Sequence, residues 1–140
     1  MHALFNQCTN LISANLDGLN TPNLTSLYNL FALCNKVTEI HVANLDVSKV
    51  TNFNNIFNGC KSLVELDLSG WYTTSATNVL YTFGSCESLQ KLDIRNFDTR
   101  NVTGTTTMFT SVPSTCEIYV GSNFTLSEAD VGFTGTFIHV

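Results

Sequence analysis

The sequence has few charged side chains, and basic side chains are the scarcest. Charged residues make up 12% of the 140 residues, and six Lys and Arg against eleven Asp and Glu give a net charge of −5. Nucleic-acid binding needs a stripe of basic side chains along the phosphates, so this balance argues against a nucleic-acid partner. The surface must be wetted mainly by neutral polar groups.

Long apolar runs, a secretory leader and zinc motifs are also missing. A membrane-spanning helix needs about 20 apolar residues in succession, and no run in the chain reaches that length, so we expect no direct membrane insertion. The first residues do not have the pattern of a secretory signal peptide, in which a basic stretch is followed by an apolar one. No CxxC pair or Cys/His cluster has the spacing of a structural zinc site, which removes zinc from consideration.

What the sequence does have is one unit repeated every 26 residues. Two residue types keep this period together: Phe5, Phe31, Phe57, Phe83 and Phe109, with Cys8, Cys34, Cys60 and Cys86. A fixed period of this size is typical of a solenoid. The odd total of five cysteines, four of them at the repeat period, favours a ladder of free, buried thiols over a disulfide framework.

Each unit reads as a strand followed by a return segment. The third unit carries the pattern LxxLxL at Leu63, Leu66 and Leu68, and its last two members alternate with polar residues, as in a strand with one buried face. Val50, Phe53 and Ile56 have helical spacing. We therefore predict an α/β solenoid, a leucine-rich-repeat-like stack of about five 26-residue coils with short parallel strands and short return helices.

The repeat fails near its C-terminal end. Residues 1–121 are predicted to form the solenoid, and residues 122–140 a cap of the same domain, since Phe133 and Phe137 supply apolar surface for the last coil. No equivalent segment precedes the first coil. Upstream repeats could dock there, or copies of the chain could associate through it.

Carboxylates gather on the exposed face of the predicted strands. Glu39, Glu65, Asp67 and Asp93 would lie within a few strand spacings of one another and could hold calcium. Neutralisation by neighbouring basic side chains without a metal is the ordinary outcome, and we expect no metal and no cofactor. His41 and Ser69 lie near Asp67, but a flat sheet offers no oxyanion donors and no exclusion of water. We expect no catalytic residue and no enzyme.

The third coil interrupts the polar columns. Tyr72, Leu80 and Tyr81 stand where neighbouring coils carry polar residues, and exposed aromatic clusters often mark contact sites. We predict that a partner binds there, with the acidic strand face of Glu65, Asp67 and Asp93 as a second surface. The alternative is a rotated helix that turns Leu80 into the core.

These units resemble the BspA-type leucine-rich-repeat surface proteins of bacteria. The resemblance covers about Leu4 to Gly121 and is closest at the words FDT (97–99) and NVT (101–103), whereas Val112 departs from the cysteine column. It implies a non-catalytic, adhesin-like module at the cell surface or secreted, which binds a protein or glycan on a host or neighbouring cell. The alternative is a structural spacer or assembly module of a phage fibre or larger extracellular protein.

Overall fold

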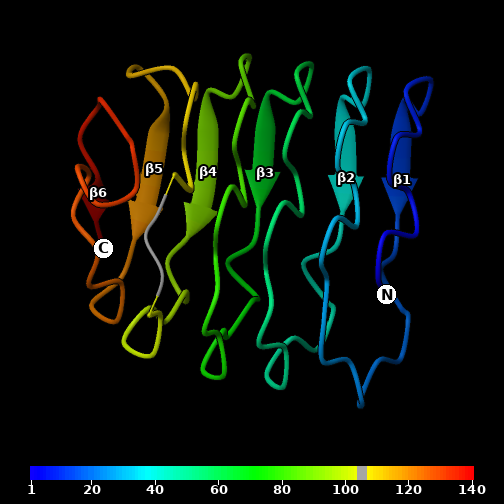
Figure 1. The fold of residues 1–140 in the computed structure, drawn as a ribbon, viewed down its shortest axis with the longest axis horizontal. Coiled ribbons are helices and arrows are strands. Elements are labelled where there is room, and N and C mark those ends of the chain that lie inside the picture. The colour runs from blue at the N-terminus through cyan, green and yellow to red at the C-terminus, as the bar shows by residue number, and fades with distance from the viewer. Residues whose placement is uncertain (104–106) are drawn as a thin grey trace.

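The chain winds into a parallel β-solenoid of about four turns, with its short strands side by side in Figure 1. This computed structural model describes residues 1–103 and 107–140. The strands are β1 Ser13–Asn15, β2 Glu39–His41, β3 Glu65–Asp67, β4 Lys91–Ile94, β5 Glu117–Val120 and β6 Ile138–His139. Paired strands are parallel and lie in register, as Ser13 with Glu39 and Lys91 with Glu117 show. The solenoid prediction is confirmed.

The prediction of five coils is wrong. Five strands of the repeat, β1 to β5, bound about four complete turns between them. After β5 the chain leaves the repeat and ends at β6, which pairs with β5 through Tyr119 and Ile138. Counting one coil for each strand therefore overestimated the number of turns.

The predicted return helices are also wrong, because no described residue is helical. The N–H of Leu27 and that of Phe31 donate to Asn52 O and Ile56 O of the next turn, at 3.1 and 2.8 Å. A helical N–H would instead bond within its own segment. Each return segment is thus a series of tight turns whose remaining N–H groups bind the neighbouring turn.

Two columns of left-handed residues interrupt the return segments. Positive φ recurs at Ala3, Asn29, Asn55 and Tyr81, and again at Gln7, Leu33, Gly59, Ser85 and Ser111. Each return segment therefore has two left-handed residues, four positions apart, and each of them interrupts right-handed helical geometry. Tight turns also advance about three residues each, so they turn the same apolar positions inward as a helix would. The apolar spacing alone therefore could not distinguish the two structures.

A column of phenylalanine rings forms the centre of the solenoid. Phe31, Phe57, Phe83 and Phe109 are fully buried, and consecutive rings stack with centroids 5.4–5.9 Å apart. Offset stacking of this kind adds to the free energy gained by burying the rings. The column predicted from the 26-residue period is confirmed as core.

The cysteines form the expected ladder of free thiols, with one exception. Cys34, Cys60 and Cys86 are buried, and their thiols donate to carbonyl oxygens one turn earlier; Cys60 Sγ lies 3.4 Å from Phe31 O. All five cysteines are free. Cys8 is exposed, so its predicted burial is wrong, because it lies on the outermost turn.

The two ends of the solenoid differ. Phe133 and Phe137 are buried at the C-terminal end, each with its ring centroid 5.9 Å from that of Phe109. At the N-terminal end Leu4 and Ile12 are 59% and 57% exposed.

Among the described residues there is no helix that could cross a membrane.

Candidate functional site

The strand face of the solenoid is interrupted between β2 and β3. The strands form two sheets, one of β1 and β2 and one of β3 to β6, so no ladder joins β2 to β3. Figure 1 shows these two strands further apart than any other neighbours. On the return side of the same two turns the bonds continue, with Phe53 N donating to Asn78 O at 2.9 Å and Phe57 N to Thr82 O at 2.9 Å. The break is therefore confined to the strand face.

Contacts between the two turns close the break at both ends of the strands. Before the strands, the hydroxyl of Ser62 donates to Asn35 O at 2.8 Å. After the strands, the indole Nε1 of Trp71 donates to Val42 O at 2.8 Å. The opening thus spans only the length of the strands, which are three residues each.

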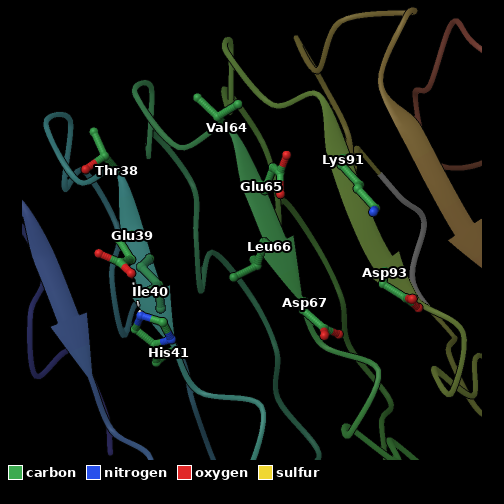
Figure 2. Close-up of a pocket in the computed structure, with 10 residues that line it drawn as sticks. All are labelled: Thr38, Glu39, Ile40, His41, Val64, Glu65, Leu66, Asp67, Lys91 and Asp93. Atoms are coloured by element: carbon green, nitrogen blue, oxygen red, sulfur yellow. Dashed lines mark hydrogen bonds and ion pairs between the residues drawn. The ribbon is translucent and has the colours of Figure 1, made fainter.

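A cleft of about 550 Å³ occupies this opening. We call it the β2–β3 cleft, and Figure 2 shows the residues that line it: Thr38, Glu39, Ile40, His41, Val64, Glu65, Leu66, Asp67, Lys91 and Asp93. Ile40 and Leu66 are buried and belong to the core, and Val64 is 37% exposed at its edge. The cleft therefore combines an apolar floor with charged walls.

The charges of the cleft are only partly neutralised. His41 Nε2 lies 2.7 Å from Glu39 Oε1. Asp93 accepts a hydrogen bond from Arg95 Nε at 3.0 Å. Partial burial acts to raise the pKa of the Asp93 carboxyl, but hydrogen bonds from Arg95 and the nearby positive charges outweigh it and lower that pKa. Asp93 is therefore held as the anion.

The carboxylates of β3 are the least engaged. Asp67 Oδ1 accepts the N–H of Ser69 at 2.8 Å, and within the described ranges neither Glu65 nor Asp67 has an ion-pair partner. Lys91 Nζ, on β4, lies 6.0 Å from the centroid of the Tyr119 ring. Two anionic groups on one wall of the cleft thus remain available to a cationic ligand.

Metal binding and hydrolysis are the two chemistries that the sequence suggested for these side chains. Over residues 1–103 and 107–140 no three His, Cys, Asp or Glu side chains are grouped closely enough to hold a metal ion. His41 pairs with Glu39, and Asp67 binds the main chain of Ser69. The side chains considered for a triad are therefore engaged elsewhere.

The residues predicted for partner binding lie in three places. Glu65, Asp67 and Asp93 are brought together in the β2–β3 cleft. Tyr72 is 59% exposed in the turn after β3, outside the cleft lining. Tyr81 is 38% exposed on the return segment, with φ of 53°. The tyrosines and the carboxylates therefore do not form one surface.

Leu80 is neither a fully exposed contact residue nor a core residue, the two alternatives that the sequence left open. It is half-buried beside the core residue Val79, in a segment that is not a helix. Its N–H is held by Asn54 Oδ1 at 2.9 Å and by Asn78 Oδ1 at 3.2 Å. Its side chain is half-buried and is not part of the core.

The break between β2 and β3 was not predicted, although the sequence carries a signal for it. One outward column along the strands reads Ser13, Glu39, Glu65, Lys91 and Glu117. Glu39 and Glu65 are its only neighbours of like charge, and the other charged neighbours alternate in sign. Like charges facing each other across strands are destabilising. The sheet opens between these two glutamates. Asp67 and Asp93 also face each other, across the paired strands β3 and β4, but there Arg95 neutralises Asp93.

Repeated turns with a ladder of stacked core side chains define a parallel β-solenoid repeat protein. The chain belongs to the family described as Mycoplasma protein of unknown function, DUF285, whose model matches residues 1–120. No match was found among curated proteins or among solved structures. The family description names no activity, so the cleft itself is the basis for a functional argument.

Proposed function

We propose that the chain is a non-catalytic recognition module whose β2–β3 cleft binds a protein or glycan partner. The observation that carries this proposal is the interruption of an otherwise regular sheet, which creates a cleft with an apolar floor and charged walls. Ligand sites commonly combine these features. The stacked turns hold the walls in place, since core contacts and return-side bonds continue on either side of the opening.

The setting of this module is proposed from the repeat pattern. A 26-residue repeat with free, buried thiols is compatible with a BspA-type lineage, for which a cell-surface or secreted, adhesin-like role is expected. The partner would then lie on a host or a neighbouring cell. Nucleic acid is a poor candidate because the cleft carries four carboxylates, Glu39, Glu65, Asp67 and Asp93.

A structural spacer or assembly role is the second candidate, and one observation favours it. Leu4, Ile12 and Leu19 are exposed on the first turn, and β1 has a strand neighbour on one side only. An apolar end with a free strand edge can stack on another repeat. Docking of upstream repeats or self-association at this turn would place the chain within a larger assembly.

The cleft proposal is tested by selecting ligands on the immobilised chain. A random-peptide display library and a glycan array are screened against the natural sequence and two variants. One variant, Glu65→Gln with Asp67→Asn, alters the cleft, and the other, Tyr72→Asn with Tyr81→Asn, alters the tyrosine surface. We expect selected ligands to lose about tenfold or more in affinity for the cleft variant alone.

The tyrosine variant makes the test decisive. Ligands that lose affinity only for that variant would move the site to Tyr72 and Tyr81 and refute the cleft. Failure to recover any ligand that distinguishes the natural chain from the cleft variant would also refute it. The spacer role is checked separately by sedimentation, since association through the first turn would be weakened by Ile12→Lys.

A further inference from the structure

We infer that the N-terminal end of the solenoid is a docking surface for one more 26-residue turn of the same kind, stacked in parallel register and continuous with the first turn. We call this surface the N-terminal face; it comprises the outer edge of β1 and the uncovered side of the first turn, with Leu4, Cys8 and Leu19. The inference rests on the assembly role proposed as the second candidate, and it names the partner of that role.

The first observation is the direction of the main-chain hydrogen bonds on the return side. Phe5 N donates to Leu30 O at 2.9 Å, and Phe31 N donates to Ile56 O at 2.8 Å. Each return segment thus donates to the turn that follows and accepts from the turn that precedes. In the first turn the equivalent acceptors have no described donor: His2 O, Leu4 O and Asn6 O. The N-terminal face therefore offers free carbonyl oxygens on its return side.

This direction decides between a second copy and a further turn. Two copies that met through their N-terminal faces would be related by a two-fold axis, and each would present the same groups to the other. Carbonyl oxygens would then face carbonyl oxygens, and buried acceptors without donors are costly. A turn in parallel register would instead direct its own N–H groups at these oxygens, as Phe5 N is directed at Leu30 O. The acceptors therefore favour a parallel turn.

The second observation is the free edge of β1, which is the end strand of the row in Figure 1. Leu16 N donates to His41 O at 2.8 Å, so the main-chain groups of Leu16 face β2. Successive residues of a strand direct these groups to opposite edges, and those of Asn15 therefore face away from β2. Asn15 pairs in register with His41, so a preceding strand would find at Asn15 O the acceptor that Leu16 finds at His41 O. Such an edge is a template for another strand.

The third observation is that three columns are buried in the next three turns but exposed in the first, namely those of Leu4, Cys8 and Leu19. Leu4 and Leu19 are 59% and 48% exposed, whereas Leu30 and Leu45, one turn later, are 0% and 2% exposed. A preceding turn would cover the first turn as each turn covers the next. Burial of this apolar surface favours stacking.

The first residue already lies in the register of the repeat. Met1 N donates to Ser26 O at 3.2 Å, and Leu27 N donates to Asn52 O at 3.1 Å one turn later. A turn that continues into Met1 therefore needs no rearrangement of the first turn. The C-terminal end of a second copy does not offer such a turn, because the chain leaves the repeat after β5 and ends at β6. The occupant is thus a further repeat turn.

The test adds one turn to the full chain. A copy of residues 27–52 is placed directly before Met1, which continues the 26-residue period, and it carries Cys34→Ala so that Cys8 remains the thiol under observation. We expect iodoacetamide to modify Cys8 of the folded, extended chain about tenfold more slowly, and the Asn15 amide to exchange with solvent about tenfold more slowly. The control carries the same 26 residues in scrambled order, which should change neither rate.

Circular dichroism verifies the folding of each chain. A second extended chain, built from a copy of residues 53–78 with Cys60→Ala, serves if the first does not fold. Rates at Cys8 and Asn15 that match those of the scrambled control in a folded chain would refute the inference.

Sedimentation of the natural chain separates this inference from the assembly role. If the natural chain self-associates and Cys8 is protected in the associated form, a second copy is the occupant, so the inference fails and the assembly role stands. If neither the added turn nor self-association protects Cys8, both fail. The recognition role of the β2–β3 cleft has its own test and does not depend on either result.

Discussion

The indole nitrogen of Trp71 donates a hydrogen bond of 2.8 Å to the carbonyl oxygen of Val42, and both residues are buried. Val42 follows β2 and Trp71 follows β3, so this bond joins the two turns just beyond the cleft. Other units place Leu45 or Phe97 in the column of Trp71, and neither side chain carries a donor. The one tryptophan of the chain therefore joins two turns at the place where the strand ladder between them is missing.

Replacing Trp71 with Phe should destabilise the fold by about 1–2 kcal/mol, because one buried hydrogen bond is lost and the smaller ring fills less of the core, although the carbonyl of Val42 keeps the N–H of Leu45 as a donor at 3.1 Å. The free energy of unfolding is measured by urea titration followed by circular dichroism. Phe97→Leu is the control, since it reduces an aromatic ring of the same column without removing a donor, and its cost should be smaller. Equal losses for the two variants would show that the indole bond contributes nothing.

Tyr81 occupies a left-handed position that asparagine fills in the two preceding turns. Its φ is 53°, and the equivalent Asn29 and Asn55 have φ of 57° and 56°. Asparagine adopts this conformation at lower cost than tyrosine. Tyr81→Asn should therefore stabilise the chain by about 1 kcal/mol, measured by urea unfolding. Tyr72→Asn, an exposed site without positive φ, should change little, and a comparable gain there would contradict the strain argument.

The repeat period was sufficient to predict the register and the core. Phe57 and Phe83 stack because the columns of a solenoid stack, and nothing more than the 26-residue interval is needed to infer it. The return helix was predicted wrongly for a physical reason. Tight turns and helices both direct apolar residues inward every three or four positions, and only the backbone at residues such as Asn55 and Gly59 distinguishes them.

The site was predicted only as a set of residues. The repeat columns, read one at a time, indicated that Glu65, Asp67 and Asp93 lie on the same face of the sheet. The structure places all three on that face, in the β2–β3 cleft. The cleft depends instead on a relationship between neighbouring strands, the like charges of Glu39 and Glu65. The residue types in a column do not reveal such a break. It is found only when the charges of adjacent residues in the column are compared.

The thiols should differ sharply in reactivity. Burial raises the pKa of Cys34 and Cys116 to about 11 and that of Cys86 to about 12, and it also raises the pKa of Cys60. A thiol must ionise and be reached before it is alkylated, and only Cys8 is exposed. Iodoacetamide at mildly alkaline pH should therefore add one group to the folded chain.

Intact mass measures the number of groups added. The same reaction in denaturant should add one group to each of the five cysteines, since all are free. Fewer than five additions in denaturant would indicate a disulfide. Rapid modification of a second thiol under native conditions would show that the core is more open than the structure indicates.

Acid stability should depend on the pair of Asp98 and Arg100. Hydrogen bonds from the Arg100 side chain, with Nε 3.0 Å from Asp98 Oδ1, lower the pKa of the Asp98 carboxyl, and its burial opposes this shift. The folded carboxyl then binds its proton at lower pH than the unfolded one. Its contribution is present above the ordinary carboxyl pKa of about 4 and is lost as the pH falls through the lowered folded value.

Arg100→Gln should therefore lower the free energy of unfolding near neutral pH, and the difference from the natural chain should shrink below about pH 4. Urea titrations at several pH values measure this difference. Lys61→Gln is the control, because it removes an ion pair with Glu87 whose side chains are both 51% exposed. A difference for Arg100→Gln that stays constant as the pH falls would contradict the assignment.

The cleft should close when the charge order along its column is restored. Glu39→Lys places a basic side chain between Ser13 and Glu65, and charges then alternate from β2 to β5. Opposite charges facing each other across strands are stabilising, and closure would pair the free edges of Ile40 and Asp67. The variant should gain about 1 kcal/mol in the free energy of unfolding, and the Ile40 amide should exchange more slowly with solvent.

Glu117→Lys is the matched control for this closure. It makes the same change of charge in the same column, but it sets two lysines opposite each other across the paired strands β4 and β5. It should destabilise the chain and leave exchange at Ile40 unchanged, because like charges oppose strand pairing. If both variants shift stability in the same direction, net charge controls the effect. The repulsion between Glu39 and Glu65 would then not be the cause of the opening.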